Sequence, residues 1–228
     1  MNARLSLIAS LILPGVGFAD VGTDHGYLPA YMAQNGYSGR IIASDIKAAP
    51  LSTAVATARE AGVEEKISFR LCDGLDAIEP NEVDTLVIAG MGGDTISGIL
   101  DSTEWCMDSR FTLLLQPMTK SEILRYWLVN NGFEITGEYL LRDGKELYQL
   151  ISARFGGETC LDDAELFTGS FALLRADVHF PEQLSRLIHR FERAIDGLER
   201  AKRPMYCRAL YSGILDRLYQ MKKELDER

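Results

Sequence analysis

Short apolar runs of strand length alternate with segments of helical period through the first two thirds of this 228-residue chain. The runs are rich in Val, Ile, Leu and Phe, whereas the segments between them carry apolar residues three or four positions apart. Strands are predicted over residues 16–21, 40–44, 67–71, 85–89 and 111–115. Helices are predicted over residues 3–13, 28–35, 50–61, 95–100 and 122–131. Because strands alternate with helices, we expect a mainly parallel sheet with helices on both faces.

The alternation stops after residue 132. Residues 133–141 and 146–153 both have strand patterns, and the turn Arg142-Asp143-Gly144-Lys145 separates them. Two strands joined by so short a turn pair antiparallel, so the parallel sheet should close with an antiparallel edge strand. The predicted fold class is therefore α/β, with a doubly wound sheet.

Beyond Gly156-Gly157 the pattern is helical throughout. Helices are predicted over residues 161–176, 181–202 and 205–226, with Pro204 between the last two. One apolar stripe runs along each long helix: Leu184, Leu187, Ile188, Phe191, Ile195 and Leu198 on the first, and Leu210, Ile214, Leu218, Met221 and Leu225 on the second. Such stripes predict a helical hairpin resembling a coiled coil. We expect two domains, residues 1–157 and residues 158–228.

Composition narrows the class of protein. No stretch reaches the roughly 20 apolar residues of a membrane-spanning helix, and the N-terminus lacks the pattern of a secretory signal. We therefore expect a cytoplasmic protein that does not contact membranes. The 4 cysteines are far apart and the 3 histidines do not cluster with them, so we expect reduced thiols and no bound metal.

The net charge of −9 argues at first against nucleic acid, because phosphate binding favours Lys and Arg. The charge is unevenly distributed, however. Residues 1–180 carry 13 basic and 25 acidic side chains, a net charge of −12, whereas residues 181–228 carry 11 basic and 8 acidic ones, a net charge of +3. The tail is thus a separate electrostatic body.

The first candidate for chemistry is the turn Asp20-Val21-Gly22-Thr23-Asp24-His25-Gly26, which follows the first strand and opens a helix. Gly22 and Gly26 allow a tight turn and a close approach to a ligand. The third glycine of a phosphate-binding G-x-G-x-x-G is missing, and Asp24 would repel a pyrophosphate. Asp20 and Asp24 suit an ammonium group, and the helix N-terminus suits a carboxylate. An ordinary strand-to-helix turn is the alternative for this motif alone.

Three further motifs follow the next three strands. Asp45 lies about 20 residues on, where an acid can accept hydrogen bonds from ribose hydroxyls. In Cys72-Asp73-Gly74, the acid stands where this fold commonly meets the amine of adenine, and the glycine leaves room beside the ring. In Gly90-Met91-Gly92-Gly93, three glycines in four residues indicate close approach of the backbone to a ligand. Seen singly, a capping Asp, an Asp-Gly turn and plain packing of Met91 are the alternatives.

Four motifs at the ends of successive strands favour one ligand site, because doubly wound sheets bind ligands beyond the carboxyl ends of their strands. An amino acid joined to adenosine matches them, so the predicted cofactor is S-adenosylmethionine. The residues assigned to it are Asp20, Gly22, Asp24, His25, Gly26, Asp45, Asp73, Gly74, Gly90, Met91 and Gly92. A nicotinamide enzyme should show the fuller glycine fingerprint and a donor pair for hydride chemistry, and we find neither.

The run from Asp20 to Pro29, with Asp73-Gly74-Leu75, Gly90-Met91-Gly92-Gly93 and Leu115-Gln116-Pro117, resembles the bacterial TrmK family. The resemblance spans roughly residues 1–155 and continues more loosely into the helical tail. It implies a class I methyltransferase (Rossmann-like) fold and methylation of N1 of the adenine at position twenty-two of tRNA. Family members often read Ser-Asp-His-Ala where this chain has Thr23-Asp24-His25-Gly26, a change that should preserve the turn.

The implied reaction needs no essential base, because N1 of neutral adenine carries a lone pair. Asp24 is the preferred acid to favour the charge that develops on the base, with Asp94 behind it. Tyr27 and His25 can stack on the target base or hydrogen-bond to it, and Gln116 can read it. Loop capping, core packing and a rigid strand exit are the alternatives for these residues.

Arg186, Arg190 and Arg193 lie three or four positions apart on one predicted helical face, where they can dock tRNA. A solvated face with internal ion pairs is the alternative. We expect a monomer or a weak dimer. Two other functions stay open: a methyltransferase of a small molecule or a protein, and a cofactor-binding assembly protein without catalysis.

Overall fold

The computed structural model describes residues 2–201 and 205–227, and the break predicted at Pro204 lies outside these residues. The chain folds into two compact units. The larger unit comprises residues 1–137 and 141–159, and the helical unit comprises residues 138–140 and 160–228.

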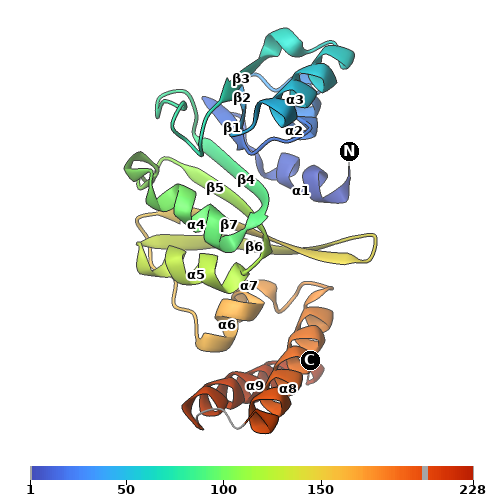
Figure 1. Cartoon of the computed structure of the whole chain (residues 1–228), viewed down its shortest axis with the longest axis vertical. Helices are drawn as coiled ribbons and strands as arrows, with labels where there is room; N and C mark the ends of the chain where they lie inside the picture. The colour runs from blue at the N-terminus through green and yellow to red at the C-terminus, as the bar shows by residue number, and fades with distance from the viewer. Residues whose placement is uncertain (1, 202–204, 228) are drawn as a thin grey trace. The chain divides into compact units, whose positions relative to one another are not determined.

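The larger unit is built on a seven-stranded sheet with the strand order β3-β2-β1-β4-β5-β7-β6 (Figure 1). The strands are β1 (Gly17–Val21), β2 (Arg40–Asp45), β3 (Ile67–Leu71), β4 (Thr85–Gly92), β5 (Thr112–Thr119), β6 (Phe133–Asp143) and β7 (Glu146–Phe155). Strands β1 to β5 pair in parallel, and β7 inserts antiparallel beside β5. The predicted class I fold, with its antiparallel insertion at the end of the sheet, is confirmed.

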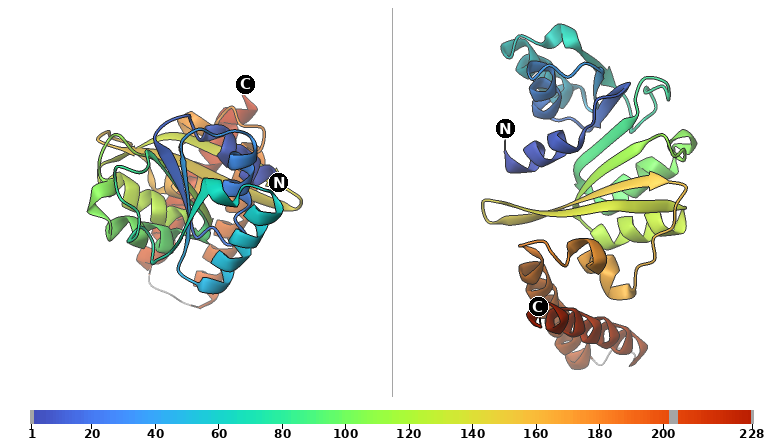
Figure 2. Two further views of the ribbon diagram at one scale, coloured as in Figure 1. Left: turned by 90° about the horizontal axis from the view of Figure 1, so that it is seen from above. Right: turned by 180° about the vertical axis from the view of Figure 1, so that it is seen from behind.

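Two groups of helices cover the sheet. In the first group, α1 (Ala3–Leu11), α2 (Tyr27–Gln34) and α3 (Ala48–Glu60) follow one another in contact. In the second, α4 (Gly93–Asp101) packs on α5 (Ser121–Asn130). Figure 2 shows the two groups on opposite sides of the sheet. All five residues of β1 are buried, as a parallel strand covered on both faces should be.

Strands β4 and β5 run further than their apolar runs predict. Residues 90–92 were expected to form a loop, but they continue β4 with two shifts in its register against β5. Gly90 has a left-handed φ of +83° within this irregular end. Glycine is a weak strand former and proline lacks an amide donor, so neither Gly90 nor Pro117 signals a strand in the sequence.

The helical unit contains α6 (Asp163–Thr168), α7 (Phe171–Leu174), α8 (Phe180–Arg200) and α9 (Met205–Asp226). The single helix predicted over residues 161–176 is wrong, because the chain turns at Gly169 with a left-handed φ of +89°. With φ of +89° and ψ of 170°, the backbone at Gly169 lies in a region that is essentially restricted to glycine, so the turn requires this residue. The two long helices pack against each other as predicted, with Leu184, Ile188, Leu218 and Met221 buried.

Candidate functional site

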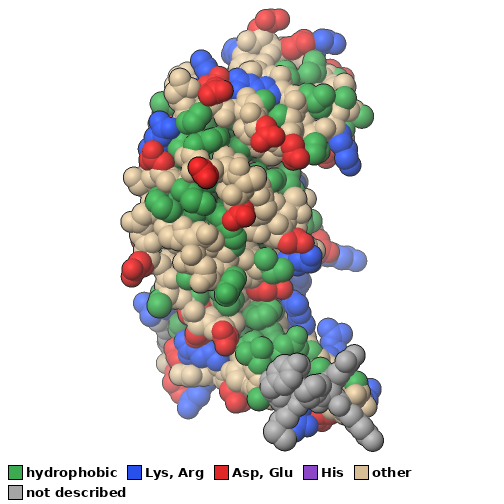
Figure 3. Space-filling model, turned by 60° about the vertical axis from the view of Figure 1, so that its left-hand side comes forward, with side chains coloured by type: hydrophobic (Ala, Val, Ile, Leu, Met, Phe, Trp, Pro, Cys, Tyr) green, Lys and Arg blue, Asp and Glu red, His purple; other side chains and the backbone are tan. Residues whose placement is uncertain are grey.

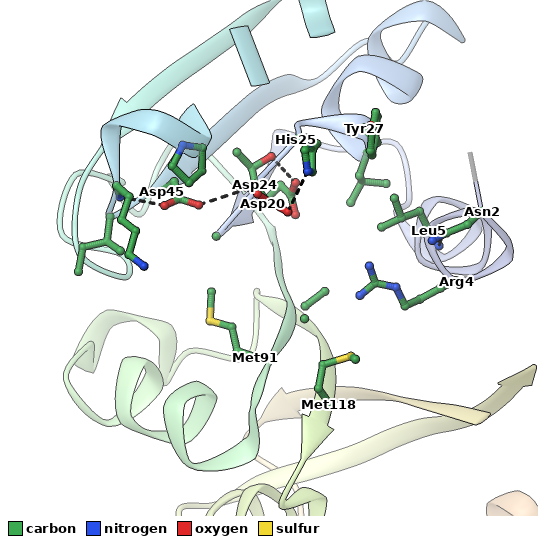
Figure 4. Close-up of a pocket in the computed structure, with 18 residues that line it drawn as sticks. Asn2, Arg4, Leu5, Asp20, Asp24, His25, Tyr27, Asp45, Met91 and Met118 are labelled. Carbon is green, nitrogen blue, oxygen red and sulfur yellow. Dashed lines mark hydrogen bonds and ion pairs between the residues drawn. The ribbon is translucent and has the colours of Figure 1, made fainter. Parts of the chain in front are cut away.

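A cavity of about 520 Å³ opens beyond the carboxyl ends of β1, β2 and β4, where the strand order reverses. We call it the switch-point cavity, and Figure 4 shows its walls. It is lined by Asn2, Arg4, Leu5, Asp20, Gly22, Thr23, Asp24, His25, Tyr27, Leu28, Asp45, Ile46, Lys47, Pro50, Ala89, Gly90, Met91 and Met118. Its size is typical of sites for small ligands and cofactors.

The turn after β1 forms one wall of the cavity. The amides of Gly22 and Thr23 both donate to the carbonyl of Ser44, at 2.8 and 2.9 Å, and so hold the turn against β2. Gly22 has a φ of +73° and Asp24 a φ of +51°. A Cβ on Gly22 would lie 2.1 Å from the terminal methyl carbon of Met91. The left-handed backbone therefore favours glycine at position 22, and a Cβ there would displace the flexible end of Met91.

Asp20 lies at the end of β1 with only 7% of its surface exposed. Its carboxylate accepts a hydrogen bond of 2.6 Å from the Thr23 hydroxyl. Burial raises the pKa of Asp20 to about 6, although the Thr23 hydrogen bond and the nearby charge of Arg4 both lower it. A ligand cation beside Asp20 would offset the cost of its buried negative charge.

Asp45 is the last residue of β2, and it also lines the cavity. Its Oδ1 accepts from the amide of Lys47 at 2.8 Å, and its Oδ2 accepts a longer bond of 3.4 Å from the amide of Asp24. The carboxylate thus connects the loops after β1 and β2 at the cavity wall (Figure 4). Ile46, with 59% of its surface exposed, adds apolar surface next to this acid.

The rim of the cavity carries two stacked rings. The His25 and Tyr27 rings lie 5.3 Å apart between centroids, at an angle of 13°. The Asp24 carboxylate lies 3.5 Å from Nε2 of His25. Tyr27 is 53% exposed. A flat aromatic surface with an acid beside it suits a planar base that gains positive charge.

Arg4 extends from α1 toward the cavity (Figure 4). Its Nη1 donates to Oε1 of Gln116 at 2.6 Å. Gln116 was predicted to read the target base, but its side chain is 1% exposed and does not line the cavity. The sequence reveals no function for Arg4, because only the packing of α1 brings this helix to the ends of the strands.

Several predicted site residues lie outside the cavity wall, and their ligand contacts stay predictions. Gly26 is buried, and its missing Cβ makes room for Ala54 of α3. Asp73, Gly74 and Gly92 do not line the cavity. The lining residues that the sequence analysis did not single out are Asn2, Arg4, Leu5, Ile46, Lys47, Pro50 and Met118. Ile46 and Lys47 directly follow Asp45, so the prediction of a ligand contact at Asp45 could have been extended to these two residues.

The three predicted tRNA contacts lie on exposed positions of α8 in the helical unit. Arg186 pairs with Glu182 at 2.8 Å, Arg190 lies over the Phe167 ring at 5.8 Å, and Nε of Arg193 donates to the carbonyl of His189. Figure 3 shows Lys and Arg side chains among acidic ones over the C-terminal helices. Both partners of each contact belong to the helical unit, and the contacts leave the three side chains at the surface.

No described helix is long and apolar enough to cross a membrane. Within residues 2–201 and 205–227, no three His, Cys, Asp or Glu side chains gather as a metal site would require.

Comparison with known proteins gives one consistent family. Residues 1–151 match the family model described as a methyltransferase domain. Over 99% of its length, the chain is 26% identical to the tRNA (adenine(22)-N(1))-methyltransferase of Bacillus subtilis, of which it covers 97%. A Streptococcus agalactiae protein of the NADB-Rossmann superfamily matches with a TM-score of 0.85 and 31% identity, covering 97% of both chains. TrmK of M. capricolum, solved with S-adenosylhomocysteine, matches with a TM-score of 0.78 and 25% identity, covering 99% of this chain and 98% of that one.

Proposed function

We propose that this chain, which belongs to the methyltransferase domain family, transfers a methyl group from S-adenosylmethionine to N1 of an adenine in the D-arm region of tRNA. Its similarity to the Bacillus subtilis enzyme extends over nearly the whole of both proteins and therefore includes the helical unit. The observation that carries the proposal is the cavity where the Gly22 turn, the buried Asp20 and the Asp45 carboxylate meet.

The residues of the cavity fit this cofactor. Asp20 provides a buried acid for the ammonium group, and Asp45 provides carboxylate oxygens for the ribose. The turn at Gly22 carries no Cβ and has only the flexible end of Met91 against it, and Ile46 and Pro50 offer apolar surface for the adenine ring. When bound, S-adenosylmethionine supplies an activated methyl group that a neutral nitrogen can accept without prior loss of a proton.

The protein's part in the reaction is alignment and charge. The lone pair of N1 must point at the methyl carbon, and positioning alone can supply much of a rate enhancement. As the new N–C bond forms, positive charge develops on the base. The exposed Asp24 carboxylate and the ring of Tyr27 at the rim favour that charge. No side chain needs to act as a base.

The substrate must present an unpaired or extruded base, because N1 lies on the edge used in base pairing. The stacked His25 and Tyr27 rings at the rim provide a surface for such a base. Arg186, Arg190 and Arg193 on α8 contact the tRNA backbone, and the net charge of +3 over residues 181–228 supports this assignment. The reaction takes place in the cytoplasm, where tRNA is modified.

A transfer assay tests the proposal. The protein is incubated with S-adenosylmethionine labelled in its methyl group and with unmodified tRNA, a protein extract or a small-molecule extract in parallel. We expect label in tRNA alone. Label in one of the other two fractions, with none in tRNA, would establish a different methyltransferase. Binding of S-adenosylhomocysteine in calorimetry, with no label transferred to any of the three fractions, would favour a cofactor-binding assembly protein without catalysis.

A further inference from the structure

We propose that a pocket between the end of β5 and the β6–β7 hairpin binds the base of a nucleotide that flanks the target adenine in tRNA. The inference deepens the proposed function and rests on it. It assigns the stacking of this base to Tyr148 and a hydrogen bond with its edge to Gln149. Neither residue stands out in the sequence.

The pocket, which we call the hairpin pocket, has a volume of about 100 Å³. Residues 117–119 and 121 line it from the end of β5, and residues 146–149 line it from the hairpin. Because β7 runs antiparallel to β5, the first residues of β7 lie at the carboxyl end of β5. The hairpin pocket is therefore at the same edge of the sheet as the switch-point cavity.

Two side chains connect the hairpin pocket with the switch-point cavity. Met118, which is 49% exposed, lines both, and Figure 4 shows it between the cavity and the strands of the hairpin. Tyr148 lines the hairpin pocket, and the guanidinium of Arg4, which lines the cavity, lies 5.6 Å from the centroid of the Tyr148 ring. An RNA strand that places its target base in the cavity therefore brings a neighbouring nucleotide to the hairpin pocket.

The lining of the hairpin pocket favours a base over a phosphate. Among the described residues that line it there is one acid, Glu146, and no Lys, Arg or His. Lys120 lies between two lining residues in the chain, but its ammonium group pairs with Asp94 and does not line the pocket. The Tyr148 ring offers an aromatic surface on which an unpaired base can stack.

Gln149 has a hydrogen-bond donor available in a fixed orientation. Arg125, which is only 1% exposed, donates from Nη2 to Oε1 of Gln149 at 2.7 Å. Because arginine has only donors, the carbonyl oxygen of the carboxamide faces it and the NH₂ group points elsewhere. Within the described part of the chain this NH₂ group has no protein partner. It can therefore donate to an oxygen or a ring nitrogen on the edge of a base in the pocket.

The first measurement uses the unaltered protein and altered tRNA. The base is removed from the nucleotide on the 5′ side of the target adenine, or from the one on its 3′ side, and filter binding compares both tRNAs with intact tRNA. We expect one of the two removals to weaken binding by about 5- to 100-fold, the range for the loss of one base stacked on an aromatic ring. A loss of less than about twofold for both removals would overturn the proposal.

The second measurement uses Tyr148→Leu. This variant should bind intact tRNA more weakly by a similar factor, and it should bind tRNA without the flanking base about as well as intact tRNA, because both changes remove the same contact. Its affinity for S-adenosylhomocysteine in calorimetry should change by less than about twofold. Tyr126→Leu is the matched control, since Tyr126 is a 61% exposed tyrosine of α5 outside the pocket, and it should bind all three tRNAs normally.

Gln149→Glu tests the hydrogen bond separately. The variant keeps an oxygen acceptor for Arg125 but replaces the NH₂ group with a second oxygen. We expect at least about fivefold weaker tRNA binding with no loss of thermal stability. Gln34→Glu adds the same charge at an exposed position of α2 outside the pocket and should bind tRNA normally. Equal losses in the two variants would assign the effect to net charge and contradict the role of Gln149.

The results separate this inference from the proposed function. If the unaltered protein transfers no methyl group to intact tRNA, the proposed function itself is wrong. If it methylates intact tRNA, but removal of the flanking base weakens binding equally in the unaltered protein and in Tyr148→Leu, only the role of the hairpin pocket is wrong. A parallel loss of S-adenosylhomocysteine affinity in Tyr148→Leu would also overturn it, by showing that the ring acts on the cofactor site through Arg4. Circular dichroism checks that the variants fold, and the measurement with altered tRNA stands without them.

Discussion

At the scale of single residues, the buried carboxylate of Asp20 lowers the stability of the free protein when it is ionised, but it favours the binding of a cation. Its pKa in the free protein is raised from 3.8 to about 6, chiefly by burial. The folded state therefore holds the proton more tightly than the unfolded state, and the contribution of Asp20 to the free energy of unfolding decreases as the pH rises from about 4 to 6. At neutral pH the carboxylate is ionised, costly to bury, and ready for a cation.

This predicts a pH-dependent affinity. An ammonium group beside Asp20 lowers the pKa of the bound state, so binding releases a proton near pH 6 and weakens as the pH falls below that value. Calorimetric titration with S-adenosylhomocysteine from about pH 5 to 8 measures this dependence. Asp20→Asn should weaken binding at neutral pH, flatten the profile and raise the melting temperature. A flat profile for the unaltered protein would contradict the assignment.

A comparison of Gly22 with Gly36 separates the effect of backbone strain from the effect of contact with a neighbouring side chain. Gly22 and Gly36 both have left-handed backbones, with φ of +73° and +78°, but only a Cβ at Gly22 would meet another side chain. Gly22→Ala and Gly36→Ala should each cost about 1–2 kcal/mol of stability. Only Gly22→Ala should weaken S-adenosylhomocysteine binding, by tenfold or more in calorimetry. Equal effects on affinity would show that strain, and not the space beside Met91, sets the requirement.

Residue types alone identified one side of the site but not the other. Asp20, Gly22 and Asp45 stood out because acids and glycines at strand ends have few structural alternatives as a group. Arg4 did not, because an arginine on a helix is common in sequences. Only the packing of α1 places Arg4 in the wall of the cavity. Asp73 and Gly74 had the same strand-end signal, yet they do not line the cavity.

At the scale of elements, an ion pair connects the segments that follow β4 and β5. Lys120, with a left-handed φ of +56°, precedes α5, and its ammonium group pairs with Asp94 in the first turn of α4. This pair lowers the pKa of Asp94. Asp94 was the second candidate for favouring charge on the base, but its side chain is engaged with Lys120 and does not line the cavity.

We therefore expect Asp94→Asn to preserve catalysis. The rate of methyl transfer to tRNA should change by less than about twofold, with a slight loss of thermal stability from the broken ion pair. Asp24→Asn, measured in the same assay, should lower kcat more, because the Asp24 carboxylate lines the cavity. A larger loss of kcat for Asp94→Asn than for Asp24→Asn would reverse the two assignments.

The helices and strands could be predicted wherever the pattern of apolar residues indicates one type of element. Alternating strands and helices gave the doubly wound sheet, and two apolar stripes gave α8 and α9. The prediction failed at Gly169, where a glycine inside a helical pattern turned out to be a required left-handed break. It also ended β4 too early, since pairing with β5 carries Gly90 into the strand.

At the scale of the whole molecule, we expect tRNA and the cofactor to bind to differently charged parts of the chain. The basic side chains of α8 bind tRNA, and the switch-point cavity with its acidic side chains binds the cofactor. Reversing Arg186, Arg190 and Arg193 to Glu should weaken tRNA binding at least tenfold, measured by filter binding, and reduce its salt dependence. The affinity for S-adenosylhomocysteine should stay unchanged, because no residue of α8 lines the switch-point cavity. Arg59→Glu, on an exposed part of α3, is the control for a change in net charge. Normal tRNA binding by the triple variant would leave these arginines as solvated surface.

The most direct test of the account is to map the methylated nucleotide. Unmodified tRNA is incubated with the protein and S-adenosylmethionine, and the modified position is read by nuclease digestion and mass spectrometry. We predict a single 1-methyladenine at position twenty-two, and no methylation of a transcript that carries guanine there. Methylation at another nucleotide or another atom, or none in tRNA that the protein binds, would contradict the proposed function.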